Sequence, residues 1–372
     1  MDLSLLAELM QGVAALTLGS VLMMAVGGGL IYLAIAREYE PMLLLPIGVG
    51  AILANLPLSP LVEQSGLLRI LYDAGVSNEV FPLLIFIGIG AMTDFGPLLE
   101  NPKMVLLGAA GQFGIFVTLL LALLLGFNVD EAAAIGIIGA IDGPTAIYVS
   151  GILAPHLLGP IAVAAYSYMA LVPLIQPPIM RLLTTKQERR IRMAYEQRPI
   201  SRRTRVVFPV TVTVVVGILV PMATPLIGML MLGNLMKESG VVERLTKTSS
   251  NEIANVATLF LGLAIGATMQ ADTFLRPETL AILVLGIAAF ALDTAAGLLL
   301  AKLLNLLSRG RFNPLIGAAG ISAFPMAARV AHKMAQAEDF ENFILMHAMG
   351  ANTAGQIASV VAGGVVLALL TS

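Results

Sequence analysis

The chain has 372 residues, of which 58% are apolar and 12% are charged. Soluble domains carry about 25% charged residues, so this chain lacks the charges that a water-exposed surface needs. With a mean hydropathy of +0.91, it is predicted to be an all-α polytopic membrane protein. The net charge of −2 excludes a nucleic-acid binder that works by bulk positive charge, and the absence of cysteine excludes thiolate chemistry.

A spanning helix needs about 20 mostly apolar residues, and many stretches of the chain approach this length. We expect a short interfacial helix at 1–11, a short or re-entrant segment at 41–57, where Pro and Gly interrupt the apolar run, and a more polar interfacial segment at 64–79. In all, roughly ten to twelve membrane segments are expected. The predicted spans are 15–36, 80–94, 104–127, 131–153 (interrupted by Gly143-Pro144), 158–183, 206–221, 224–236, 252–269, 278–306, 313–331 and 341–370.

The segment 184–205 interrupts this apolar pattern and holds eight of the chain's 21 basic residues. Cytoplasmic loops of membrane proteins collect Lys and Arg, so this linker is predicted to be cytoplasmic. It either sets the orientation of the chain only or also docks a soluble partner. It divides the chain into a first membrane half, 1–183, and a second, 206–372.

The two halves resemble each other. Residues 135–149 (IGIIGAIDGPTAIYV) and 316–330 (IGAAGISAFPMAARV) share the pattern I-G-x-x-G-x-x-x-x-P-x-A-x-x-V. FIGIGAM at 86–92 loosely matches FLGLAIGATM at 260–269, and Asn55 and Asn234 close similar Gly-rich runs. Duplicated halves whose helices are broken at matching places are typical of transporters with inverted repeats. The alternative is that Gly and Pro are simply common in membrane helices.

The clearest charged residues inside the predicted spans are Asp142, Asp293 and Arg329. A charge at the bilayer centre costs about 2.5–3.5 kcal/mol on insertion scales, so each needs a reason. Asp142 lies in the break of the first half and Arg329 just past the matching break of the second. If the breaks cross, the two charges face each other, either in a ligand site or as an ion pair that fixes packing. Asp293 has no assigned role; it pairs with a lysine or faces a cavity.

Oxygen atoms suited to sodium gather near these breaks. Unwound turns expose backbone carbonyls that can coordinate a hard cation, and one nearby carboxylate supplies the charge. Asn and Ser in such helices can equally be packing contacts between helices. The candidate side chains are Asp142, Thr145, Asn313, Ser322 and Asn352, with the hydroxyls of Tyr166 and Tyr168.

Five segments of the chain carry long and specific motifs. They are IGAIDGPTAIYVSG (138–151), VAAYSYMALVPLIQPPIM (163–180), GNLMKESGVVERL (233–245), NPLIGAAGISAFPMAARV (313–330) and LMHAMGANTAGQI (345–357). These segments closely resemble the beta subunit of the sodium-pumping, biotin-dependent decarboxylases, which act in complexes on oxaloacetate, methylmalonyl-CoA or glutaconyl-CoA. The similarity runs from EPMLLLPIGVG at 40–50 to the final helix.

This resemblance implies a membrane subunit that decarboxylates carboxybiotin, consumes a proton and moves sodium outward. A soluble alpha subunit would load the biotin, and a small gamma subunit and a homotrimer of the beta subunit complete the assembly. The expected location is the cytoplasmic membrane of a bacterium or archaeon. The chain has no biotinyl site of its own, because neither of its two Lys-Met pairs, Lys103-Met104 and Lys333-Met334, has the Met that usually precedes the lysine. Biotin must therefore arrive on another subunit.

The resemblance also carries over individual residues. The aspartate of the D-G-P-T motif is Asp142, and the tyrosine of A-Y-S-Y-M is Tyr168. The family's four functional residues on the segment that begins N-P-L-I-G correspond to Asn313, Gly317, Ser322 and Arg329. Arg329 is expected to bind carboxybiotin, because a guanidinium can hold a planar carboxylate with two hydrogen bonds. Catalytic roles are expected for Arg329, Asp142, Tyr168 and Ser322, and sodium binding for Asp142, Asn313, Gly317, Ser322 and Asn352.

The alternative function is a secondary sodium–carboxylate symporter with the same duplicated architecture. In that case Arg329 would bind the carboxylate of a transported substrate, and no partner subunit would be needed. Co-purification with a biotinylated protein would favour the pump.

Overall fold

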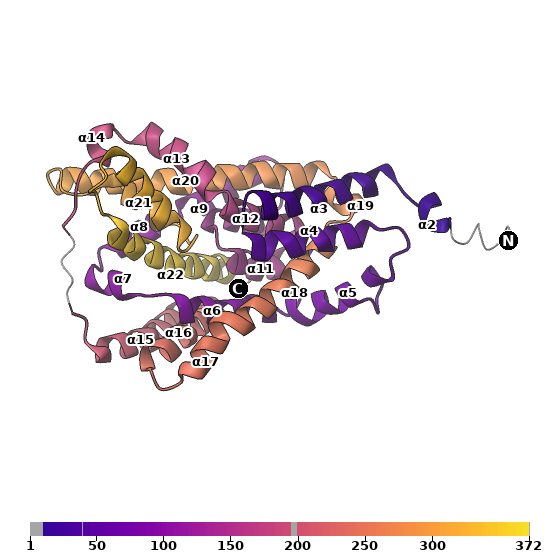
Figure 1. Ribbon diagram of the computed structural model, residues 1–372, viewed down its shortest axis with the longest axis horizontal. Coiled ribbons are helices and arrows are strands. Elements are labelled where there is room, and N and C mark those ends of the chain that lie inside the picture. Colours follow the sequence, from indigo (N-terminus) through magenta and orange to yellow (C-terminus); the bar gives the residue numbers. More distant parts are fainter. Residues whose placement is uncertain (1–9, 39, 195–198, 372) are drawn as a thin grey trace.

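The computed structural model describes residues 10–38, 40–194 and 199–371, and within these ranges the chain contains helices and no strand. The helices form an elongated bundle, with α2 (Gln11–Ala14) and α19 (Ala271–Phe274) toward one end and α14 (Lys186–Arg189) at the other (Figure 1). Most of the predicted interfacial helix at 1–11 lies outside the described residues. The prediction of an all-helical chain is confirmed.

Five helical stretches are long and apolar enough to cross a membrane, and the number rises to seven if each of two bent pairs counts as one span. The expected ten to twelve segments are not confirmed. The five are α3 (Leu18–Ala36), α8 with α9 (Met104–Ala110 and Phe113–Leu124), α17 to α18 (Glu243–Thr248, η6 Ser249–Ile253, Ala254–Ala267), α20 (Pro277–Leu307) and α22 (Leu345–Leu370).

One of the two bent pairs agrees with the sequence prediction and the other does not. The segment at 41–57 forms α4 (Pro41–Asn55), and the chain then turns by 110° into η1, α5 and η2 (Pro60–Val62, Leu67–Leu71 and Tyr72–Val76), as expected for a short or re-entrant segment. Residues 158–183 were expected to form one span. They form α12 (Leu158–Ala170) and α13 (Val172–Leu183) instead, with a bend of 66° between them, because Pro173 at the start of α13 cannot continue the hydrogen-bond ladder of α12.

The expected span at 313–331 is also not a single helix. It forms the 3₁₀ turn η7 (Pro314–Gly320), a non-helical stretch around Pro325, and the amphipathic helix α21 (Met326–Glu338). Three other predicted spans correspond to α6 (Val80–Met92), α15 (Arg202–Leu219) and α16 (Thr224–Ser239), none of which is long and apolar enough to count among the five. Short elements follow or join the helices: α7 (Gly96–Glu100) follows α6, η4 (Pro155–Leu157) precedes α12, and η5 (Pro221–Ala223) joins α15 to α16.

The two halves pack against each other in a reciprocal way. Helix α4 of the first half packs on α18 of the second, and α16 of the second packs on α6 of the first. Glycines allow this close approach: a Cβ on Gly90 of α6 would collide with the carbonyl of Leu230 on α16, and a Cβ on Gly50 of α4 would lie 2.5 Å from the carbonyl of Leu263 on α18. Matching helices of the two halves thus bury equivalent surfaces.

Two asparagines, Asn55 and Asn234, each donate a side-chain hydrogen bond to a backbone carbonyl of the other half. Asn55, at the end of α4, donates to the carbonyl of Met269 at 2.7 Å and accepts the amide of Ala271 at 3.1 Å. Asn234 on α16 donates to the carbonyl of Thr93, which follows α6, at 3.1 Å. Figure 1 places α19, which begins at Ala271, and α7, which follows Thr93, toward opposite ends of the molecule. The two contacts therefore lie near elements at opposite ends of the molecule (Figure 1).

The two similar motifs fold into similar breaks. In the first half, α10 (Val129–Gly136) passes into the 3₁₀ turn η3 (Ile137–Ala140), and α11 (Gly143–Leu153) begins at the predicted interruption. In the second half, η7 is followed by α21. The breaks touch, because the amide of Ser322 donates to the carbonyl of Ala140 at 3.3 Å.

The basic linker is attached to the second half rather than free in solvent. The guanidinium of Arg189 forms an ion pair with Glu338 at 2.6 Å, and Arg192 pairs with Asp339 at 2.6 Å. The side-chain amides of Asn313 and Asn342 donate to the backbone carbonyls of Arg189 and Ile191. The linker therefore holds the C-terminal end of α21 and the start of η7 together.

We predict that Gly90→Ala lowers the thermal stability of the purified protein, while Gly28→Ala leaves it unchanged. A Cβ at Gly90 meets the backbone of α16, whereas a Cβ at Gly28 in α3 meets no atom within 4 Å. Forcing an extra carbon into a packed contact costs about 1–3 kcal/mol. The melting temperatures in one detergent provide the comparison. Equal values for the two variants would show that the contact between α6 and α16 can relax freely.

Candidate functional site

The two breaks open onto a cavity of about 420 Å³ between the halves. Its polar lining comes from both broken segments and from the helices behind them, and the rest of the wall is apolar. The polar and charged lining residues are Asp142, Tyr166, Thr258, Ser322, Arg329 and Gln356. Asp142 and Ser322 are 7% and 6% exposed. The sequence-predicted candidates Asp142, Ser322 and Arg329 are thus brought to one cavity.

Asp142 is the N-cap residue of α11 and, among the described residues, the only carboxylate that lines this cavity. One carboxylate oxygen accepts hydrogen bonds from the hydroxyls of Thr145 at 2.8 Å and Ser359 at 2.7 Å. The other accepts the amide of Thr145 at 3.4 Å. A helix N-terminus carries a partial positive charge, which favours a carboxylate there. Within the part of the chain that the structure describes, the carboxylate is therefore held by dipoles and hydroxyls and not by a cationic side chain.

The backbone immediately before Asp142 is strained. Ile141 adopts a left-handed conformation with φ of 51°, which is costly for a β-branched residue. This conformation ends η3 and turns the chain into α11, so that Asp142 can cap that helix. The hydrogen bond between Ser322 and Ala140 lies one residue away. The geometry of the first break therefore depends on the second.

Two polar side chains contact or belong to the second break: Ser322 within it, and Asn352 on α22, which packs against it. The hydroxyl of Ser322 donates to the carbonyl of Gly355 at 3.0 Å, and the amide of Asn352 donates to the carbonyl of Ile321 at 2.7 Å. The Oδ1 atom of Asn352 is buried and has no hydrogen-bond partner among the described residues. Since buried polar atoms are nearly always satisfied, this free oxygen is a candidate ligand atom.

Tyr166 supplies another unsatisfied oxygen. Its hydroxyl is buried and has no partner among the described residues. Its ring lies against Gly143, where any Cβ would collide with it. The glycine after Asp142 is therefore required by close packing with α12, which brings the phenol to the wall of the cavity.

Arg329 lies on α21 and is exposed. It lines the cavity that Asp142 also lines, yet no ion pair joins the two side chains within the described part of the chain. Arg329 also lines a separate groove between α13 and α21. The expected alternative of a buried ion pair that only fixes the packing is therefore not seen, and the guanidinium stands at the boundary between the cavity and the groove.

Three predicted site residues lie elsewhere. The hydroxyl of Tyr168 donates to the carbonyl of Leu283 on α20. Asn313 caps η7, with its side-chain oxygen accepting the amide of Leu315 at 3.0 Å, and binds the linker. Gly317 packs against the backbone of Gly297 on α20. Tyr168 fastens α12 to α20, and Asn313 and Gly317 fasten the second broken segment to the linker and to α20; none of the three lines the cavity.

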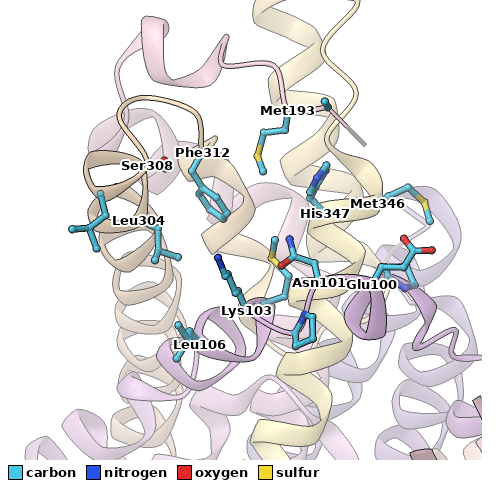
Figure 2. A pocket seen from close by; sticks show the side chains of 15 residues that line it. Glu100, Asn101, Lys103, Leu106, Met193, Leu304, Ser308, Phe312, Met346 and His347 are labelled. Carbon is cyan, nitrogen blue, oxygen red and sulfur yellow. The ribbon is translucent and has the colours of Figure 1, made fainter. Parts of the chain in front are cut away.

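A larger cavity of about 670 Å³ lies near Asn313, at the linker end of the molecule. Figure 2 shows side chains from several elements around it, including Met193 of the linker, Phe312, Lys103 and His347. The amide of Asn313 donates to the sulfur of Met193 at 3.3 Å. Neither Asp142 nor Ser322 lines this cavity, so the two spaces are distinct.

The buried carboxyl group of Asp293 accepts a hydrogen bond from the backbone at the start of α9. It is fully buried in α20, and one of its oxygens accepts the amide of Gly114 at the start of α9. It forms no ion pair with a lysine among the described residues. Because α8 and α9 meet at a break in a continuous span, the carboxylate supplies an acceptor for an amide that would otherwise lack one. The sequence could not assign this contact, which joins distant parts of the chain.

Ser359 is the functional candidate that the sequence reasoning missed. It lies on α22 with Asn352 and Gln356, and the spacing of four and three residues puts the three polar side chains on one face of an apolar helix. Gln356 also accepts a hydrogen bond from Thr93 at 3.3 Å. In the sequence, the row of Asn352, Gln356 and Ser359 on one face of an otherwise apolar helix could have identified Ser359 as a candidate.

A family model described as the Na+-transporting oxaloacetate decarboxylase beta subunit matches residues 19–370. The chain belongs to this family. The methylmalonyl-CoA decarboxylase subunit beta of Propionigenium modestum is 54% identical to this beta subunit over 383 residues, which cover 96% of each chain. The glutaconyl-CoA decarboxylase subunit beta of Acidaminococcus fermentans is 54% identical over 97% of this chain and 96% of the relative.

The oxaloacetate decarboxylase beta chain of Haemophilus ducreyi is 48% identical to this beta subunit over 97% of each chain. Relatives named for three different acids therefore match this beta subunit over nearly its whole length, which confirms the family expected from the sequence motifs. The matched range contains both broken segments and every predicted site residue.

Proposed function

We propose that this beta subunit decarboxylates carboxybiotin and couples that reaction to outward sodium transport. The observation that carries the proposal is the cavity at the crossing of the two breaks, where the buried carboxylate of Asp142, the hydroxyl of Ser322 and the free guanidinium of Arg329 share one space. A cation site and an anion site are adjacent there. Coupling requires this proximity, because each ligand then alters the electrostatic environment of the other.

Arg329 binds the carboxylate of carboxybiotin. Among the described residues it is the only cationic one that lines the cavity, and a guanidinium forms paired, charge-assisted hydrogen bonds with a carboxylate. Decarboxylation breaks the bond between the carboxyl carbon and the ureido nitrogen and releases CO₂. The electron pair left on that nitrogen takes up a proton. That proton is the one consumed in each turnover.

Sodium binds at Asp142, with oxygen ligands from the second break and from α22. Asp142 supplies the negative charge, while Ser322 and the unpartnered Oδ1 of Asn352 supply neutral oxygens. The unwound turns add backbone carbonyls, as in other transporters with broken helices. Asn313 and Gly317 act as positioning residues that fix the second broken segment to the linker and to α20, and Tyr168 fixes α12 to α20. The hydroxyl of Tyr166 faces the same cavity and suits proton delivery.

The architecture behind this site is two inverted repeats, 1–183 and 206–372, joined by the cytoplasmic linker 184–205. The reciprocal packing of α4 on α18 and of α16 on α6 supports the proposal, as do the paired contacts of Asn55 and Asn234. A π-helical turn precedes α6 and another precedes α18. Helices that match in sequence thus also match in their irregularities.

The subunit works in a complex with a biotin-bearing alpha subunit and a small gamma subunit, in a trimer of beta subunits. The complex lies in the cytoplasmic membrane of a bacterium or archaeon. Because no biotinyl lysine is recognisable in this chain, the biotin reaches the cavity on the alpha subunit. A symporter would bind a free carboxylate substrate instead, and its purification would recover no biotinylated partner.

We predict that Asp142→Asn abolishes sodium-stimulated decarboxylation while the complex still assembles. An amide keeps the shape but removes the charge, and losing a hydrogen-bonded charge costs about 1.5–3 kcal/mol, so the rate should fall by more than about tenfold. Ser359→Ala should raise the sodium concentration for half-maximal rate by a smaller factor. Ser150→Ala is the control, since Ser150 is equally buried but bonds only its own helix. Normal sodium stimulation in Asp142→Asn would remove the carboxylate from the ion site.

We predict that Arg329→Lys lowers the rate of carboxybiotin decay by about ten- to a hundredfold, because lysine cannot form the second charge-assisted hydrogen bond, worth about 1.5–3 kcal/mol. Carboxylation of biotin by the alpha subunit should be unaffected, since it occurs before carboxybiotin reaches this site. The two half-reactions are measured separately in the purified complex. A normal rate of decay would place the carboxylate elsewhere.

We predict that single cysteines after α4 and α16 are labelled from opposite sides of the membrane. Leu58 and Val241 follow these matching helices and are 66% and 77% exposed. Arg202 at the end of the linker donates to the carbonyl of Ser239, so Val241→Cys should be labelled from the same side as Thr185→Cys in the linker. The natural chain has no cysteine and gives no background. Labelling of Leu58→Cys and Val241→Cys from one side would refute the inverted arrangement.

A further inference from the structure

A groove of about 390 Å³ lies between α13 and α21 and reaches Arg329 from outside the cavity. Small-molecule sites typically have volumes of about 300–1,000 Å³, so the groove is large enough for a ligand. Arg329 lines both the groove and the cavity that contains Asp142. A molecule that lies in the groove can therefore present one end to Arg329.

The groove has an apolar floor and cationic walls. Lys333 follows Arg329 by one turn of α21, which is about 6 Å along the helix axis, and Arg181 projects from the C-terminal part of α13. All three cations are exposed, and within the described residues none of their side chains forms a hydrogen bond or ion pair. The apolar lining consists of Pro173, Pro177, Met326, Val330, Met334 and Ala337.

The one acidic residue of the groove is already neutralised. Glu338 lines the far end, and its carboxylate binds Arg189 of the linker at 2.6 Å. The hydrogen bond from Arg189 lowers the pKa of the Glu338 carboxyl, so that this carboxyl stays ionised and paired near neutral pH. The three free cations therefore give the groove a net positive charge, which favours an anionic ligand with an apolar body.

We propose that this groove is the path by which carboxybiotin enters, and that Arg181 and Lys333 are positioning residues that direct its carboxylate toward Arg329. The inference rests on the proposed function and extends it to two residues with no assigned role. The apolar floor suits the hydrocarbon arm and ring of biotin, and the carboxylate supplies the one negative charge. From Ala337 to Arg329 the groove follows α21 for about 12 Å, which suits an extended arm rather than a compact anion.

The test uses the purified complex with free N-carboxybiotin as substrate, and the variants Arg181→Gln, Lys333→Gln and the double variant. Exposed charge interactions are worth up to a factor of about five each. The substrate concentration at half-maximal rate should therefore rise roughly two- to twentyfold in the double variant, with the maximal rate changed by less than about twofold. Added salt should weaken substrate binding in the natural complex and have less effect in the double variant, because salt screens exposed charges.

Two kinds of control accompany this test. Arg203→Gln removes the same charge from the exposed start of α15, outside the groove, and should behave like the natural complex. Arg181→Lys and Lys333→Arg keep the charge and should restore near-normal half-saturation. Because neither Arg181 nor Lys333 has a partner in the fold, melting temperatures of the glutamine variants should match the natural complex.

Two outcomes would overturn the inference. One is an unchanged half-saturation and salt dependence in the double variant. The other is a double variant that loses only a response to anionic lipid, measured in vesicles with and without phosphatidylglycerol, which would assign the groove to a lipid headgroup. A natural complex that fails to decarboxylate N-carboxybiotin would instead contradict the proposed function, so the two failures are distinguishable.

Discussion

One buried carboxylate without a cationic partner organises the centre of this molecule. Removing an ion from water costs several kcal/mol even after the protein relaxes, and Asp142 recovers part of that cost from a helix N-terminus and two hydroxyls. The helix N-terminus and the hydroxyl of Thr145 are available because α11 begins at the break, and the hydroxyl of Ser359 is available because α22 packs against it. The packing of the two halves is therefore what makes this carboxylate tolerable. A site that lacks a permanent counter-charge retains affinity for a mobile one, and this is the physical basis for assigning sodium to it.

The two breaks serve the site in different ways. The first provides the charge, through Asp142, and the strained residue before it. The second provides the hydroxyl of Ser322 and leads directly to Arg329, since the same chain runs from η7 past Ser322 into α21. The linker and α20 fix this second segment from outside, through Asn313, Gly317 and Glu338. Movement of the second segment would therefore change the proposed cation site and the proposed anion site together, which is what the proposed coupling of decarboxylation to ion movement requires.

The repeated motifs predicted the positions of both breaks, and with them the placement of Asp142 and Ser322, because Gly and Pro act locally on the backbone. Three other features depend on which helices become neighbours, and periodicity within one segment does not contain that information. Tyr168 contacts α20 instead of the cavity, Ser359 reaches Asp142 from a distant helix, and Asp293 caps α9. Arg329 was expected within a span. It is exposed because residues 326–338 form a short amphipathic helix. The bend between α12 and α13 was not predicted either, because the length of the apolar run does not show where a helix bends.

The most direct test of the central claim follows sodium and protons at the same carboxylate. Carboxybiotin decay and sodium uptake are measured together in vesicles that contain the natural complex, over a range of sodium concentrations and at several pH values. A proton and a sodium ion compete for the carboxylate of Asp142, because protonation removes its charge. The sodium concentration for half-maximal rate should therefore rise as the pH falls, and sodium uptake should parallel carboxybiotin decay under every condition. A half-maximal sodium concentration that is independent of pH, or decay that continues without uptake, would contradict the account.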